Sequence, residues 1–476
     1  MKIGIWCVWL MAIGAVEERS VETVHTVKIQ GFPVNYRAQV GQLPLEDSVS
    51  LSYISYVKEG VDDASTRPIT FCFNGGPGSS SIWLHMGLLG PKRVVLKETG
   101  GAVAPYQMVD NDFSLLDVTD LVFLDPVSSG YSTASDPKKY WNSEEDLKTF
   151  AQAIRLLLTR MDRWMSPKYL CGESYGTARA AALASDMQQK NRLYLNGIIM
   201  VSPVLDMQTV SYGEGLNDLP YFLSLPSFTA AAWYHKKLPL DLQLDLSKAL
   251  LEAEALALSD YAAILNKGDR ITTAEREKMI VRLSRLTGLS APFLERSNLR
   301  VSVFSFAKEL LADQKKVIGR FDSRTLGFDT NPLRREINYD PSTEAVFGSY
   351  TACFNHYLVS DLNWKSDQEY VPLASVSWDF VNCNNQYFSV VSDLSDTLMR
   401  NPQLKVFVAS GIYDLATPYF GALYTFDHLG LDPQVRKNVT LQLYEGGHTL
   451  FTDPAVLPKL RQDLQRFYVN PSHSTR

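Results

Sequence analysis

One serine in this chain stands where a nucleophile would. The segment Gly172-Glu173-Ser174-Tyr175-Gly176 lies between a run typical of a buried strand, 169–173, and an alanine-rich run typical of a helix, 174–190. A serine on a sharp turn between strand and helix is exposed at the edge of a sheet, and flanking glycines avoid clashes there. We therefore predict Ser174 as a nucleophile. A serine that merely caps the following helix is the alternative.

Such a nucleophile needs two partners. A serine hydroxyl is weak at neutral pH, so it needs a base to take its proton and an acid to orient the base. Asp414 follows the apolar run 404–410, and His448 follows the run 439–445. Polar residues that follow parallel strands gather at one edge of a sheet, so we predict that both residues meet Ser174 there.

Two rivals compete for these roles. Asp206 also follows a strand-like run, 195–201, and is the alternative acid. His85 lies near a glycine-rich loop, but it precedes the serine. The turn resembles the one that carries the nucleophile in α/β-hydrolases. By that resemblance the acid and then the histidine should follow the serine in the chain, which favours Asp414 and His448.

A glycine-rich segment, Asn74-Gly75-Gly76-Pro77-Gly78, directly follows a third strand-like run. Attack on a carbonyl produces an oxyanion, which backbone N–H groups can stabilise. We predict one donor from Tyr175, after the nucleophile, and the other from Gly76, whose missing side chain lets the backbone approach a substrate. A tight loop without a ligand is the alternative.

The elements that must position these residues alternate between strand and helix. After strand-like runs at 24–29 and 51–57, six apolar runs predict a mostly parallel central sheet, so the predicted fold class is α/β. These runs are 69–74, 120–125, 169–173, 195–201, 404–410 and 439–445, with helices at 143–165, 174–190, 419–429 and 455–467. Ser143 is the expected N-cap of the first helix.

The strand pattern stops between residues 206 and 337. Helical spacing at 240–258, 273–286 and 304–318 predicts a mainly helical cap over 206–345. The cap would be inserted between two halves of the core, 20–205 and 346–476.

Composition excludes some partners. The 476 residues are 45% hydrophobic, enough for a large core, and carry a net charge of −6. No basic field is present for a phosphate backbone, so nucleic acid is not an expected partner. Neither a CxxC nor an HExxH motif occurs, and we expect no metal and no cofactor.

The N-terminus and the cysteines bear on location. Lys2 and the apolar run 3–16 are typical of a signal peptide over 1–16, which predicts export to the periplasm or the outside. No other run approaches the length of a membrane span, so we expect no stable membrane insertion after its removal. Cys72 and Cys171 lie in apolar runs and are expected as buried thiols, whereas a Cys353–Cys383 disulfide is an open option.

The motifs, taken together, resemble the serine carboxypeptidase family (peptidase family S10). FNGGPGSSS (73–81), LGP (89–91), DPVSSGYS (125–132), GESYG (172–176), SGIYD (410–414) and GGH (446–448) follow in the family's own order. Their spelling is closer to bacterial members than to lysosomal or vacuolar ones. The resemblance covers about 68–205 and 400–455, and it implies the α/β-hydrolase fold with an inserted cap.

By this resemblance, the protein trims residues from the C-termini of peptides. Ser174, Asp414 and His448 would form its triad, and Gly76 and Tyr175 its oxyanion hole. Asn74, Gly75 and Glu173 match positions that grip the substrate's terminal carboxylate. Two carboxylates repel unless one holds a proton, so such a grip favours acid pH or a raised pKa of the glutamic acid. A structural ion pair is the alternative role for Glu173.

The chain departs from the family at this grip. Cys72 replaces the family's tryptophan, and Leu88 replaces a glutamate. Three functions follow as hypotheses: a carboxypeptidase acting on peptides with a free C-terminus, an esterase or acyltransferase on the same scaffold, and a non-catalytic binding protein. No motif indicates the side-chain specificity or the oligomeric state.

Overall fold

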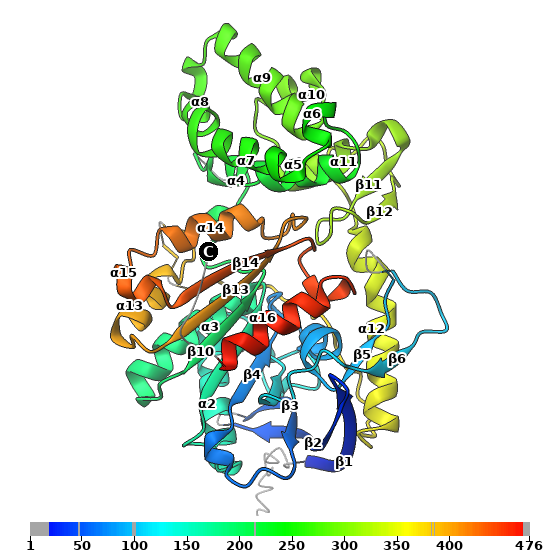
Figure 1. Ribbon diagram of the computed structural model, residues 1–476, viewed down its shortest axis with the longest axis vertical. Helices are drawn as coiled ribbons and strands as arrows, with labels where there is room; N and C mark the ends of the chain where they lie inside the picture. Colours follow the sequence, from blue (N-terminus) through cyan, green and yellow to red (C-terminus); the bar gives the residue numbers. More distant parts are fainter. Residues whose placement is uncertain are drawn as a thin grey trace, which may run out of the picture.

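The computed structural model describes residues 19–45, 48–97, 101–213, 216–381, 383–384 and 386–469. The predicted export segment 1–16 lies outside these residues. One mixed sheet has the strand order β1-β2-β3-β7-β4-β9-β10-β13-β14, with β8 paired to β3 (Figure 1). Its strands are β1 (Arg19–Ile29), β2 (Phe32–Pro44), β3 (Val49–Lys58), β4 (Ile69–Phe73), β7 (Asp120–Leu124), β8 (Thr133–Ala134), β9 (Lys168–Glu173), β10 (Gly197–Val201), β13 (Lys405–Gly411) and β14 (Val439–Tyr444).

The prediction of a mostly parallel central sheet is confirmed. Every pairing from β7 to β14 is parallel, whereas β1, β2 and β3 form an antiparallel edge. Strands β4, β7, β9 and β10 are buried along their whole length, as expected for strands covered on both faces. The sequence did not single out β2, which pairs with β1 through a turn at Gln30 and Gly31, both with positive φ.

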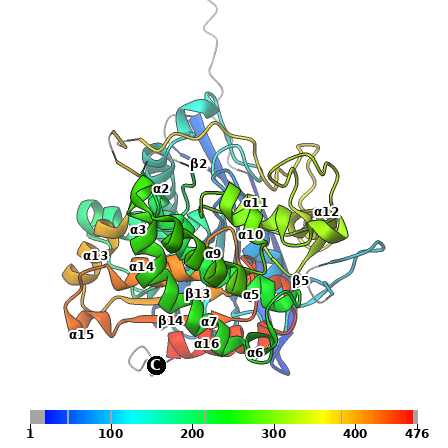
Figure 2. The ribbon, with the colours of Figure 1, turned by 90° about the horizontal axis from the view of Figure 1, so that it is seen from above.

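Helices cover both faces of the sheet. Apolar residues of α2 (Ser143–Arg160), α3 (Tyr175–Asp186) and α13 (Val391–Arg400) form one core layer. Those of α12 (Pro341–Ser360) and α16 (Leu457–Val469) form the other. Figure 2 shows α2, α3 and α13 on one side of the strands and α12 on the other.

A helical cap stands above the carboxyl ends of β13 and β14 (Figure 1). Its helices are α4 (Leu219–Leu223), α5 (Leu225–Tyr234), α6 (Leu240–Gln243), α7 (Leu246–Leu256), α8 (Ala262–Leu265), α9 (Thr273–Thr287), α10 (Ala291–Arg296) and α11 (Val303–Glu309). Its apolar core also includes Ile412, Tyr413 and Leu415, which follow β13, and Tyr419 and Phe420 of α14 (Tyr419–Asp427). The cap is thus packed directly against the segment that carries Asp414. The division at residue 345 remains a prediction, and α12 runs across it.

Two local expectations are wrong, and one option that the sequence left open is decided. The predicted helix 304–318 ends at Glu309, because Lys315 takes a left-handed φ and β11 (Lys316–Ile318) pairs with β12 (Leu326–Phe328). Helix α2 is capped by Asn142, whose extended backbone lets its side chain accept from the amides of Glu144 and Glu145, and not by Ser143. The Cys353–Cys383 disulfide does not form, and both residues are free thiols.

None of the helices described within 19–469, outside the gaps, is long and apolar enough to cross a lipid bilayer.

Candidate active site

Ser174 occupies the sharp turn between β9 and α3. Its backbone has φ 57° and ψ −132°, a strained conformation held by the hydrogen bond from its N–H to the carbonyl of Val201 at 2.9 Å. Gly172 and Gly176 permit the turn, since a Cβ on Gly172 would lie 2.2 Å from the carbonyl oxygen of Gly176. The Ser174 side chain does not cap α3, so the alternative of a helix-capping serine is wrong.

Asp414 and His448 meet beyond the ends of β13 and β14. Nδ1 of His448 lies 2.8 Å from Oδ2 of Asp414, and both residues are buried. The amides of Ala416 and Thr417 donate to Oδ1 of Asp414 at 2.7 and 3.0 Å, and the Thr417 hydroxyl donates to Oδ2 at 2.8 Å. These donors fix the carboxylate that orients the imidazole.

The other ring nitrogen of His448 faces the turn that carries Ser174. Its Nε2 lies 3.6 Å from Oε1 of Glu173, the residue before the serine. Burial lowers the pKa of His448, but the charge and hydrogen bond of Asp414 and the charge of Glu173 outweigh burial, and the pKa is raised. Among the described residues no hydrogen bond joins the Ser174 hydroxyl to His448, so that link belongs to the proposal below.

The rival residues have other partners. Asp206 accepts a hydrogen bond from the amide of Gln208 at 2.8 Å and caps a short 3-10 turn. His85 is fully buried, stacks on Phe123 with ring centroids 4.1 Å apart, and bonds the Tyr56 hydroxyl. Burial lowers the pKa of His85 to about 3, so it is a neutral core histidine.

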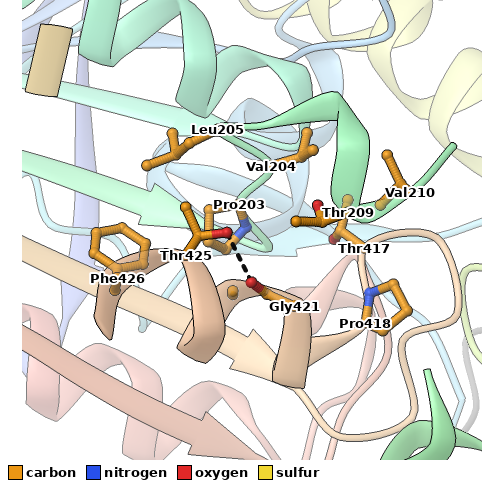
Figure 3. A pocket seen from close by; sticks show the side chains of 11 residues that line it. Pro203, Val204, Leu205, Thr209, Val210, Thr417, Pro418, Gly421, Thr425 and Phe426 are labelled. Atoms are coloured by element: carbon orange, nitrogen blue, oxygen red, sulfur yellow. Dashed lines mark hydrogen bonds between the residues drawn. The ribbon is translucent and has the colours of Figure 1, made fainter. Parts of the chain in front are cut away.

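A narrow pocket lies between the segment that carries Asp206 and the loop 412–418, which we call the acid loop because it carries Asp414 (Figure 3). Pro203, Val204 and Leu205 line it from the strand β10 side, and Thr417 and Pro418 line it from the acid loop. The carboxylate that reaches His448 is that of Asp414.

The glycine-rich loop packs tightly against the nucleophile turn. A Cβ on Gly75 would lie 2.5 Å from the amide nitrogen of Tyr175 and 2.7 Å from that of Gly176. Gly76 has φ +98°, which a residue with a side chain rarely adopts. The backbone of Gly75 and Gly76 therefore lies directly beside the turn that carries Tyr175. Gly76 and Tyr175 are the two residues predicted to donate to the oxyanion.

Glu173 lies beneath the turn and is buried. Its Oε2 accepts from Nδ2 of Asn74 at 2.8 Å. Burial raises the pKa of Glu173, although the charge of His448 and the hydrogen bonds from Asn74 and the Gly75 amide oppose it. Glu173 is therefore protonated at a higher pH than an ordinary glutamic acid.

A buried ion pair supports the glycine-rich loop from behind. Nε of Arg179 lies 2.7 Å from Oδ2 of Asp146, and Nη1 donates to the carbonyl oxygen of Asn74 at 2.7 Å. The Arg179 side chain is fully enclosed. Cys72 and Leu88, which stand where the family has tryptophan and glutamate, are buried in the adjoining core layer.

The cap supplies contacts that the sequence did not indicate. Phe321 lies in the loop 319–325, between β11 and β12. Its carbonyl oxygen accepts a hydrogen bond from the amide of His448 at 2.5 Å. Arg324 of this loop joins Asp322 to Asp453, with an Nη2–Oδ2 distance of 2.6 Å to the former. The loop follows the predicted helix 304–318 within the predicted cap, and no motif marks it. Thr417, by contrast, could have been found, because the pattern Asp-x-x-Thr is typical of a side-chain-capped turn.

Known proteins were compared with this chain. Residues 30–446 match the family model described as serine carboxypeptidase. Serine carboxypeptidase-like 20 of Arabidopsis thaliana is 24% identical over 225 residues, which cover 46% of this chain and 43% of that protein. Serine carboxypeptidase-like 29 of the same plant is 26% identical over 204 residues, 40% of each chain. The chain thus spans less than half of the length of these curated relatives.

One solved structure shows the fold. The crystal structure of Kex1(Δ)p, described as a prohormone-processing carboxypeptidase from Saccharomyces cerevisiae, aligns over 91% of both chains with a TM-score of 0.57 and 17% identity. At this level the likeness concerns the fold alone, and it confirms the predicted α/β-hydrolase fold. Since the family model covers most of the chain, the chain belongs to the serine carboxypeptidase family.

Proposed function

We propose that this chain is a serine carboxypeptidase that releases C-terminal residues from peptides through an acyl-enzyme on Ser174. The observation that carries the proposal is the buried His448–Asp414 pair, whose free ring nitrogen faces the turn of Ser174. Family membership gives the expected reaction.

The first step forms the acyl-enzyme. The Ser174 oxygen attacks the last peptide carbonyl while its proton moves to Nε2 of His448, and Asp414 stabilises the imidazolium that results. The amides of Gly76 and Tyr175 would stabilise the oxyanion, and losing one such donor typically costs about 100- to 1000-fold in rate. The C–N bond then breaks, and His448 returns the proton to the leaving amine.

The second step restores the enzyme. Water gives a proton to His448 and its oxygen attacks the ester carbonyl, after which the Ser174–acyl bond breaks and the serine regains a proton. The products are the released amino acid and the shortened peptide.

Asn74, Gly75 and Glu173 would hold the terminal carboxylate of the substrate. A protonated Glu173 donates a hydrogen bond to that carboxylate, whereas an ionised Glu173 repels it. Burial raises the pKa of Glu173, which extends the protonated form to higher pH. Substrate binding should therefore weaken as pH rises through this pKa.

A comparison of two substrates tests the proposal. A blocked dipeptide with a free C-terminus should be cleaved, whereas its C-terminal amide should be cleaved at least about tenfold more slowly in kcat/KM. The variant Glu173→Gln should lose much of this preference and its dependence on pH. An unchanged preference and pH profile would remove Glu173 from the carboxylate grip.

An esterase or acyltransferase is the second candidate. The observation that favours it is the apolar, buried state of Cys72 and Leu88, which leaves fewer polar groups near the carboxylate grip than the family motif provides. Hydrolysis of an amino-acid ester without cleavage of either dipeptide would select this candidate. A chain that binds peptides but cleaves none of these compounds would be a binding protein.

We also propose that the protein is exported, on the basis of the signal-like segment 1–16. Fractionation of the producing cells should recover the chain, shortened at its N-terminus, outside the cytoplasm. Recovery of the intact chain inside the cell would contradict export.

A further inference from the structure

Arg320 lies on the cap loop that contacts the catalytic segments. Its carbonyl oxygen accepts a hydrogen bond from the amide of Leu415, the residue after Asp414, at 3.0 Å. Its own amide donates to the carboxylate of Asp340, at the start of α12, at 3.2 Å. The backbone of Arg320 is thus fixed between the acid loop and α12.

The side chain of Arg320 lies among aromatic rings beside His448. Its guanidinium carbon is 4.8 Å from the ring centroid of Phe321 and 5.6 Å from that of Phe304. The ring of Phe321 in turn lies 4.7 Å from the His448 ring. The cation is half-buried, and its charge opposes protonation of His448.

Within the described part of the chain, this guanidinium makes no hydrogen bond and no ion pair. Arg324, four residues later on the same loop, is different: it bonds Asp322 and Asp453, and it donates to the carbonyl of Glu445 at 3.0 Å. The loop therefore holds one arginine that is satisfied by the protein and one whose five donors are left for solvent or a ligand.

A carboxylate is the group that a free guanidinium binds best, because two parallel N–H donors match its two oxygens. The terminal carboxylate of the substrate already has its proposed partners, Asn74 and Glu173, on a different segment of the chain. A second carboxylate near the scissile bond can only come from an acidic side chain.

We infer that Arg320 is a specificity-determining residue that binds an acidic side chain next to the scissile bond of the peptide. The inference rests on the proposed carboxypeptidase function and adds the class of substrate. Contact with the rings of Phe321 and Phe304 restricts the guanidinium, so less freedom is lost when the carboxylate binds.

Matched peptides test the inference. Blocked dipeptides with a free C-terminus carry Glu or Gln either before or after the scissile bond, and are compared near pH 6.5, where the Glu side chain is ionised. We expect kcat/KM to be about tenfold higher for Glu than for Gln at one of the two positions. In Arg320→Met this ratio should fall to about one while the Gln peptides are still cleaved, and Arg320→Lys should retain part of it.

Arg296→Met is the control. Arg296 also lies over a phenylalanine ring, that of Phe293, but on α10, in the part of the cap remote from the sheet (Figure 1). This variant should keep the wild-type ratio.

Three results would overturn the inference: no preference for Glu in the wild type, an unchanged ratio in Arg320→Met, or an equal loss on the Glu and Gln peptides in both Arg320 variants. If the wild type cleaves none of the peptides, the proposed function fails instead, and the two failures remain distinct.

Discussion

The close packing of Gly75 on the nucleophile turn yields a quantitative prediction for Gly75→Ala. The new methyl carbon would lie 2.5 Å from the amide nitrogen of Tyr175, whereas ordinary contact begins at 3.4 Å. The glycine-rich loop and the turn must therefore separate by 0.9 Å. The backbone of Gly75 itself has no left-handed φ, so the substitution adds a steric clash without backbone strain.

A separation of this size should slow the reaction strongly. A misplacement of about 1 Å can cost roughly 100-fold in rate, equivalent to about 2.7 kcal/mol in the activation barrier. Because the displaced Tyr175 amide belongs to the proposed oxyanion hole, we expect a loss in kcat. Since Gly75 also belongs to the proposed carboxylate grip, KM should rise as well.

The assay measures kcat and KM on a blocked dipeptide, with thermal unfolding measured in parallel to verify that the variant folds. Gly421→Ala on α14 is the control, since a methyl carbon there would meet Thr209 at an ordinary 3.8 Å (Figure 3). It should retain the wild-type kcat within about twofold. A folded Gly75→Ala protein that keeps more than a tenth of the wild-type kcat would refute the reasoning.

Three further predictions concern the groups around the site. The acid limb of kcat/KM should lie at higher pH than an unperturbed histidine would give, because the pKa of His448 is raised and its neutral form is the base. Glu173→Gln should shift this limb to lower pH, and an unshifted limb in the pH–rate profile argues against their contact. Thr417→Val removes a donor to Asp414 and should lower kcat about tenfold with little change in KM; an unaltered kcat would show that Thr417 does not position the acid. Arg179→Met leaves Asp146 buried without its cation, so urea unfolding should show a free energy of unfolding about 3–5 kcal/mol lower than in the wild type. The double variant Arg179→Met/Asp146→Leu should recover most of this loss, and a loss below about 1 kcal/mol in Arg179→Met contradicts the role.

The sequence could predict the features that depend on neighbouring residues. Strands β4, β7, β9 and β10 are short, mostly apolar runs that are buried along their whole length, so their pattern identified them. The turn at Ser174 was partly local: Gly172 is required by contacts with Gly176 and Thr177, whereas Gly176 is required by the backbone of Phe73 and Asn74.

The features that the sequence could not predict depend on distant contacts. Residues 316–318 become a strand only because they pair with 326–328, and nothing in their own spacing marks that hairpin. The proximity of Arg320 to His448 arises from a loop 128 positions away in the chain that packs on the acid and histidine segments. A charged residue in such a loop reads as surface until the tertiary structure shows what it contacts.

The identity of the nucleophile is the central claim, and covalent labelling tests it most directly. A fluorophosphonate probe, followed by digestion and mass spectrometry, should place one adduct per chain on Ser174, with no adduct in Ser174→Ala and labelling slowed by several orders of magnitude in His448→Ala. An unlabelled Ser174 in a folded protein, or labelling that His448→Ala leaves as fast as in the wild type, would contradict the account.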